Sequence, residues 1–247
     1  MRQGEVWDAE TARSYDTPGL GMFEPEVLGP TVNRLAALAD GGRALEFAVG
    51  TGRVAVPLAR RGVPVAGIEL SRPMLDQLRT KADDATIPVV VEDMATGRVP
   101  GTFQLVYLVY NALSNLLTQE EQVACLRNAA RHLVPGGRLA IELWVPDTGR
   151  LPPGQQAVVW RSEPGYIGLD TFDVSRQRVV SHHFSFGDGP EARVFRSPHR
   201  YVWPAELDLM AQLAGFERES RHADWSGTEF TPESRSHVSV YRLPPAA

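Results

Sequence analysis

The feature that most constrains the fold is a regular alternation of apolar runs with segments of helical character across residues 43–144. The apolar runs lie at 43–49, 63–70, 88–91, 103–109 and 139–144. Between them, segments 54–61, 71–79 and 119–133 carry apolar residues at helical spacing. Strands that alternate with helices form a parallel sheet covered on both faces. The sequence therefore predicts an open, doubly wound α/β domain.

Local signals mark the ends of several helices. Ser71 has the side chain of an N-cap residue and is followed by a proline in the first turn. The stretch Thr118-Gln119-Glu120-Glu121 has the pattern of a capping box. Pro135-Gly136-Gly137 is expected to end the helix that this box opens. Further helices are expected at residues 8–15 and 25–40.

The pattern changes after Pro146. Alternating segments without helices between them follow, at 157–161, 167–174, 179–186 and 194–202. Such consecutive strands pair as antiparallel sheet. A helix at 204–213 and strands at 216–222 and 237–242 complete the chain. We therefore expect a β insertion between the fifth strand of the main sheet and its last helix.

Composition excludes several classes of function. The chain has 25 basic against 30 acidic residues and a net charge of −5, which disfavours a nucleic-acid partner. Cys125 is the one cysteine, so no internal disulfide can form. The first residues lack a signal-peptide pattern, and no apolar run reaches the ~18 residues of a membrane span. These features predict a cytoplasmic protein without a membrane partner.

The turn after the first strand carries the first functional signal. Gly50-x-Gly52-x-x-Ala55, with Glu69 further along, fits a dinucleotide fingerprint and leaves a nicotinamide-dependent oxidoreductase open as an alternative. Glu46 argues against it, because a carboxylate would repel a pyrophosphate but suits an ammonium or a sulfonium. Asp93 can accept a hydrogen bond from the amino group of an adenine, while Met94 covers the ring. These properties favour a cationic nucleoside ligand.

Together these motifs resemble the class I S-adenosylmethionine-dependent methyltransferases over about residues 40–146. The resemblance implies that Glu46 and the turn 48–52 meet the methionine end of the cofactor, and that Glu69 takes both ribose hydroxyls. It places Asp93 and Met94 at the adenine, and Tyr110 with Asn111 near the sulfonium. The cofactor-binding set expected on this basis is Tyr15, Glu46, Ala48, Gly50, Gly52, Glu69, Leu70, Met74, Asp93, Met94, Tyr110 and Asn111. Ala48 departs from the glycine that the family often has there.

Within that superfamily the chain is similar to small-molecule methyltransferases of bacterial natural-product pathways, including sugar N,N-dimethyltransferases. Ser14-Tyr15-Asp16 matches their N-terminal lid motif, and Trp144-Val145-Pro146 their exit from strand five. The resemblance implies one Rossmann-like domain over 1–247 with a seven-stranded sheet. Its expected parts are a lid at 1–24, a cofactor-binding core at 40–146 and 203–247, and the insertion at 150–202 over the substrate.

The expected reaction is methyl transfer from S-adenosylmethionine to a small-molecule acceptor, with nitrogen favoured over oxygen or carbon. Asn115 stands where the sugar enzymes carry a histidine, which leaves an amino-sugar substrate in doubt. Adjacent strand residues point to opposite faces, so either His182 or His183 is expected to face the substrate. The sequence favours His182 as the catalytic candidate, acting as a base or as a hydrogen-bond partner of the substrate. Asn115, Trp144, Arg178 and His199 are the other expected substrate contacts.

Two alternatives to catalysis by this set remain open at this stage. One is the nicotinamide-dependent oxidoreductase, and the other is a ligand-binding protein that keeps the fold without turnover. The sequence shows no cluster of His, Cys and Asp residues at metal-ligand spacing, so no metal is expected. The exposed strands of the insertion could pair two subunits as a homodimer.

Overall fold

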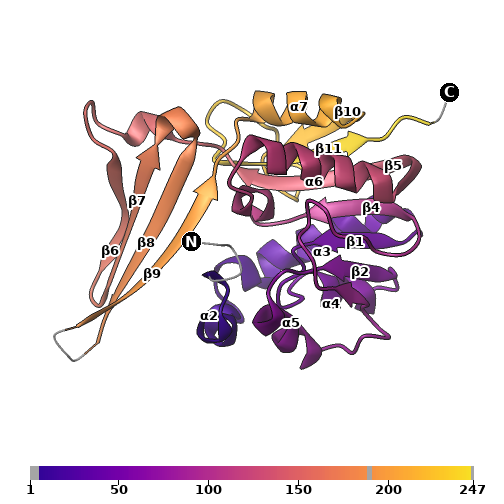
Figure 1. The fold of residues 1–247 in the computed structure, drawn as a ribbon, viewed down its shortest axis with the longest axis horizontal. Helices are drawn as coiled ribbons and strands as arrows, with labels where there is room; N and C mark the ends of the chain where they lie inside the picture. Colours follow the sequence, from indigo (N-terminus) through magenta and orange to yellow (C-terminus); the bar gives the residue numbers. More distant parts are fainter. Residues whose placement is uncertain (1–5, 188–190, 246–247) are drawn as a thin grey trace.

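A mostly parallel sheet forms the centre of the computed structural model, which describes residues 6–187 and 191–245 (Figure 1). Its strand order is β10-β11-β5-β4-β1-β2-β3. The bounds are β1 Ala44–Phe47, β2 Val65–Ile68, β3 Val89–Val90, β4 Phe103–Leu108, β5 Leu133–Trp144, β10 Glu217–His222 and β11 Ser236–Arg242. Strands β1 to β5 pair in parallel, and β11 pairs antiparallel with both β5 and β10.

Helices cover both faces of this sheet. The described helices are α2 Ala9–Tyr15, α3 Pro25–Ala39, α4 Ala55–Arg60, α5 Arg72–Arg79, α6 Gln119–His132 and α7 Pro204–Leu213. Buried residues of α3, α4 and α5 pack with Leu105 and Tyr107 of β4, whereas those of α6 and α7 pack with Val106 and Leu108. Strands that are buried on both faces have continuous runs of apolar residues, and the sequence shows such runs. The predicted fold class is confirmed.

The capping signals act as predicted, and one boundary differs. The Met74 backbone N–H donates to Ser71 Oγ at 3.2 Å, and Thr118 forms a capping box with Glu121. The predicted stop at Pro135-Gly136-Gly137 lies instead inside β5, which begins at Leu133 directly after α6. A Cβ on Gly137 would lie 2.9 Å from the Val134 carbonyl oxygen, so glycine is needed in this irregular stretch.

A second sheet follows β5 and is antiparallel throughout. Its order is β6-β7-β8-β9, with bounds Ala157–Glu163, Tyr166–Asp173, Arg178–Phe186 and Ala192–Arg200. Figure 1 shows this sheet standing beside the main domain, with α2 next to its lower part. The chain thus forms two walls that face each other across the N-terminal segment.

A buried polar cluster at the end of β9 anchors the small sheet. The Arg200 guanidinium donates to Gln122 Oε1 of α6 at 2.6 Å and to Glu206 Oε1 of α7 at 2.7 Å. The Gln122 side-chain amide donates in turn to the carbonyls of Leu113 and Leu116. Arg200 therefore ties the second sheet to the segment that follows β4. No helix among the described residues has the length and apolar character needed to cross a membrane.

Candidate active site

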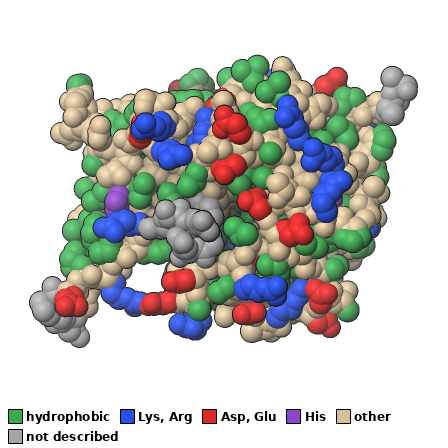
Figure 2. Space-filling view, viewed as in Figure 1, with side chains coloured by type: hydrophobic (Ala, Val, Ile, Leu, Met, Phe, Trp, Pro, Cys, Tyr) green, Lys and Arg blue, Asp and Glu red, His purple; other side chains and the backbone are tan. Residues whose placement is uncertain are grey.

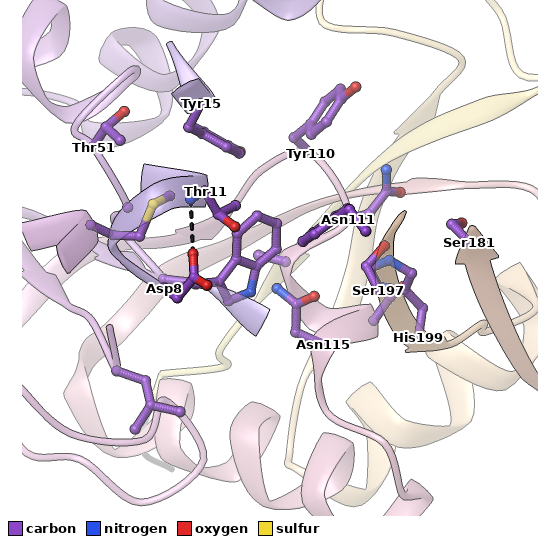
Figure 3. A pocket seen from close by; sticks show the side chains of 18 of the residues that line it. Asp8, Thr11, Tyr15, Thr51, Tyr110, Asn111, Asn115, Ser181, Ser197 and His199 are labelled. Atoms are coloured by element: carbon purple, nitrogen blue, oxygen red, sulfur yellow. Dashed lines mark hydrogen bonds between the residues drawn. The ribbon is translucent and has the colours of Figure 1, made fainter. Parts of the chain in front are cut away.

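A cavity of about 1300 Å³ lies between the carboxyl ends of the parallel strands, helix α2 and the small sheet. In open α/β sheets, this edge is where ligands bind. Figure 3 shows side chains from all three parts facing the same space. The cavity lining includes these residues of the predicted site: Tyr15, Glu46, Ala48, Gly50, Glu69, Leu70, Met74, Asp93, Met94, Tyr110, Asn111, Asn115, Trp144 and His199.

The turn after β1 is bound to Glu69 at the end of β2. Glu69 Oε2 accepts the Gly50 N–H at 2.7 Å, and Oε1 accepts the Ser71 N–H at 2.7 Å. Burial raises the pKa of this carboxyl, and the backbone hydrogen bonds oppose the rise. Each oxygen of a carboxylate has room for more than one donor. The buried, oriented Glu69 therefore fits a diol, such as the two hydroxyls of a ribose.

Glu46 lies deeper, at the end of β1. It is 2 % exposed, and its Oε2 accepts a hydrogen bond from the Tyr107 hydroxyl at 2.9 Å. Burial raises its pKa to about 8, against the smaller opposing effects of Tyr107 and Arg53. A carboxyl in this state is stabilised as the anion by a cation placed beside it. The ammonium of an amino acid fits this chemistry.

The segment after β4 is held in a strained conformation. Tyr110 and Asn111 have φ of 48° and 64°, in the left-handed region that side chains disfavour. Glu142 holds both, since Oε2 accepts the Tyr110 N–H at 2.7 Å and its carbonyl accepts the Asn111 N–H at 3.2 Å. Asn111 Oδ1 accepts the Trp144 N–H at 2.7 Å. These bonds fix the ends of β4 and β5 against each other at the cavity.

The N-terminal segment closes one side of the cavity. Thr51 Oγ1 donates to Asp16 Oδ1 at 2.6 Å, and Asp16 also pairs with Lys81. Ser71 Oγ donates to the Trp7 carbonyl at 2.6 Å. Tyr15 packs edge-on against Trp7, and burial raises its pKa to about 12. The predicted lid at 1–24 is attached to the cofactor turn in this way; residues 1–5 lie outside the described part.

Met94 and Asp93 line the cavity at the end of β3. Met94 is 7 % exposed and belongs to the core under the sheet. Asp93 Oδ1 accepts the Ala95 N–H at 2.7 Å, which orients the carboxylate. An apolar thioether beside an oriented acceptor fits an aromatic base with an amino group. The order of these groups along the sheet edge matches the predicted order of amino-acid end, ribose and base.

Three predicted site residues do not line the cavity. Gly52 lies behind the turn, where a Cβ would be 3.0 Å from Leu78. His182 and Arg178 are on the other face of β8, where His182 Nε2 contacts Thr171 Oγ1 at 3.0 Å. The cavity face of β8 carries Ser181, His183 and Ser185. The predicted orientation of His182 and Arg178 was wrong: strand alternation puts them on the face opposite His183, and the packing of the small sheet turns the His183 face to the cavity.

Sequence reasoning missed four cavity residues on the small sheet, Trp160, Tyr166, Asp170 and Phe195, and preferred His182 to the neighbouring His183, which does line the cavity. The Tyr166 hydroxyl and His183 Nδ1 are 2.6 Å apart. The sequence signal for this group was weak, because Asp170 is one of several polar residues in its strand, beside Thr171 and Asp173. Within the described chain, no three His, Cys, Asp or Glu residues are grouped to hold a metal ion.

Comparison with known proteins agrees with this geometry. A family profile described as "Methyltransferase domain" matches residues 44–137. The cypemycin N-terminal methyltransferase of a Streptomyces species is 28 % identical over 97 % of this chain and 98 % of its own length. The structure of the CcbJ methyltransferase from Streptomyces caelestis is 34 % identical, with a TM-score of 0.83 over 99 % of this chain and 98 % of that one.

A third similarity concerns the fold. The structure of S-adenosylmethionine-bound CalS10, an amino pentose methyltransferase from Micromonospora echinaspora, has a TM-score of 0.65 and 23 % identity. It covers 95 % of this chain and 94 % of that one. The predicted alternative of a nicotinamide-dependent oxidoreductase has no support among these relatives. This chain belongs to the S-adenosylmethionine-dependent methyltransferases, as its similarity over the whole chain, its strand order and the carboxylates along the sheet edge indicate together.

Proposed function

We propose that this enzyme methylates a nitrogen atom of a small-molecule acceptor. The observation that carries the proposal is that both histidines of the cavity lining are poor bases. Burial lowers the pKa of His199 to about 4 and also lowers the pKa of His183. A hydroxyl or carbon acceptor needs a positioned base, whose ideal pKa lies near the working pH. A neutral amine attacks with its own lone pair and needs no such base.

Bound S-adenosylmethionine supplies an electrophilic methyl group on a sulfonium. In the proposed arrangement, Glu69 accepts hydrogen bonds from the two ribose hydroxyls, and Glu46 faces the cationic amino-acid end. Asp93 accepts from the adenine amino group, with Met94 against the ring. Tyr110 and Asn111 lie beside the sulfonium, and Tyr15 covers it from the lid. The geometry described above supports each of these roles.

The acceptor is proposed to lie on the opposite side of the cavity. Figure 3 shows Asn111, Asn115, Ser197 and His199 on one side of the space. His199 Nδ1 is buried without a hydrogen-bond partner among the described residues, and so is Ser114 Oγ. A neutral His199 can accept an N–H of the acceptor amine, which would orient the nitrogen lone pair toward the methyl group. Trp144 adds an apolar wall next to this position.

Catalysis by this arrangement consists mainly of positioning. The acceptor atom must approach the methyl carbon to ~3 Å, in line with the bond that breaks. The transfer discharges a cation, so exclusion of water favours it. We propose that the insertion at 150–202 and the N-terminal segment provide this exclusion by covering the cavity from two sides.

The test is an activity screen with purified protein, S-adenosylmethionine and small molecules that carry both an amine and a hydroxyl. Mass spectrometry of the product locates the added methyl group. We expect N-methylated products, and a His199→Gln variant should raise KM with little change in cofactor affinity. His222→Gln, on β10 outside the cavity lining, is the matched control. Products methylated only on oxygen or carbon would contradict the proposal.

A further inference from the structure

The wall of the cavity formed by the small sheet contains a carboxylate, Asp170, of which one oxygen accepts no hydrogen bond from the residues that the structure describes. Asp170 on β7 lies opposite Ser181 on β8, which lies opposite Ser197 on β9. Its Oδ1 is buried and has no hydrogen-bond partner among the described residues. No Lys or Arg in the described ranges forms an ion pair with it. A buried acceptor without a partner destabilises the protein, and a ligand that donates a hydrogen bond to it recovers this loss.

Aromatic rings gather on the same wall. The His183 ring lies 5.5 Å from Trp160, 6.1 Å from Tyr166 and 5.4 Å from Phe195, measured between ring centroids. All four residues line the cavity together with Asp170. Strand pairing places them around the carboxylate, since His183 is two residues from Ser181 and lies opposite Phe195. A carboxylate is thus set among the faces and edges of several rings.

Two irregularities in the sheet position Trp160. The pairing of β6 with β7 shifts register between Val159 and Arg161, so Trp160 is the extra residue of a β-bulge. Opposite it, a Cβ on Gly168 would lie 2.4 Å from the Trp160 ring. Glycine at this position leaves the space that the indole occupies beside β7. Bulge and glycine therefore both serve to bring the ring next to Asp170.

The charges around this wall favour a positive ligand. Arg193 and Glu10, both in the cavity lining, pair with each other, and Asp8 adds a further acid there. Figure 2 shows acidic and basic side chains meeting around an opening beside the small sheet. Cations are attracted to aromatic faces, and most strongly where water is excluded. We propose that Asp170, with Trp160, Tyr166, His183 and Phe195, binds a positively charged group of the acceptor molecule.

This inference rests on the proposed function, and it adds that the bound cation is not the atom that is methylated. An ammonium held by a carboxylate keeps its proton and has no lone pair with which to attack the methyl carbon. The position agrees, because β7 is two strands away from β9, which packs against the 3₁₀ turn η2 Ala112–Asn115. Two strand spacings amount to roughly 10 Å. The acceptor is therefore a molecule with a cationic group remote from the methylated nitrogen.

The experiment compares benzylamine, charged at neutral pH, with benzyl alcohol, its uncharged counterpart of similar shape. Both are titrated into the protein saturated with S-adenosylhomocysteine, and binding is followed by NMR. We expect benzylamine to bind at least tenfold more tightly, which is the worth of a hydrogen bond to a charged group. Asp170→Asn should remove this preference. Gly168→Ala, which displaces Trp160, should weaken benzylamine binding severalfold.

Asp173→Asn is the matched control, because Asp173 ends the same strand, lies outside the cavity lining, and asparagine can still cap the η4 turn that follows. This variant should keep the preference for benzylamine. Equal binding of the two probes, or a preference that survives in Asp170→Asn, would overturn the inference. Failure of all variants and the unmodified protein to bind S-adenosylhomocysteine would instead overturn the cofactor roles in the proposed function, so the two failures are distinguishable.

Discussion

We expect the buried Glu46 to make cofactor affinity depend on pH. Without a ligand its pKa is about 8, chiefly because burial disfavours the charged carboxylate. If the ammonium of the ligand lies beside Glu46, binding favours the ionised form. Binding at neutral pH should then release a proton, and affinity for S-adenosylhomocysteine should rise as the pH is raised toward 8.

The size of the effect follows from the pKa. With a pKa of about 8, the carboxyl is ionised in about one molecule in thirty at pH 6.5 and in about three of four at pH 8.5. If only the ionised form binds, the apparent Kd differs by about twentyfold between these values. The proton released should approach one per bound ligand near pH 6.5.

Isothermal titration calorimetry at both pH values, in buffers of different ionisation enthalpy, measures the affinity and the proton release together. In Glu46→Gln the twentyfold change should shrink, whereas Glu92→Gln, another carboxylate of the cavity lining, should preserve it. Burial also raises the pKa of Glu69, so the difference between the protein and Glu46→Gln is the decisive quantity. The same pH dependence in both would refute the reasoning.

The same group affects the stability of the ligand-free protein, with a definite sign. Its folded-state pKa of about 8 exceeds the ordinary value of 4.5. The folded protein therefore holds a proton that the unfolded chain releases. This contribution to stability is complete below about pH 4.5 and is lost as the pH rises through 8. Glu46→Gln should flatten that part of the stability profile.

Three further predictions concern other sites. Glu69→Gln should raise the Kd for S-adenosylhomocysteine by about 10- to 150-fold, which is the worth of one hydrogen bond to a charged group. Asp76→Asn, on the exposed side of α5, should leave this Kd unchanged, and equal effects of the two variants would contradict a ribose-binding role of Glu69. Ala48 has φ of 56°, a left-handed conformation that strains a residue with a Cβ, so Ala48→Gly should raise the free energy of unfolding by about 1 kcal/mol in urea titrations. A lower free energy of unfolding in this variant would contradict the strain at Ala48. Arg200→Leu leaves Glu206 without its buried cation and should lower the free energy of unfolding by about 3 kcal/mol. A decrease of less than about 1 kcal/mol would contradict the role of Arg200 in anchoring the small sheet.

The grouping of the proposed cofactor residues at one edge of the cavity could be predicted because these residues belong to local motifs. Glu46, Gly50, Glu69 and Asp93 each stand at the end of a strand that the sequence marks by an apolar run. Parallel strands bring such ends to one edge of the sheet, so position along the chain is enough to place these residues together. The capping box at Thr118 was visible for the same reason, because all its contacts lie within one turn.

The substrate half could not be predicted in this way. Along β8 the faces that carry His182 and His183 are both partly polar, so alternation alone does not say which one meets the cavity. The side chains around Asp170 come from four strands, and one of them is placed by a β-bulge. The register between those strands decides these contacts.

The sequence by itself determined the layer architecture, the strand ends that bear the proposed cofactor residues, and the presence of an antiparallel insertion. These follow from hydrophobic periodicity and from turn and cap residues, which act over a few positions along the chain. Only the tertiary structure decided which face of the insertion lines the cavity, and that one oxygen of Asp170 there has no hydrogen-bond partner in the described part of the chain. Burial and charge pairing depend on segments distant in sequence, and their positions are set only when both sheets are packed.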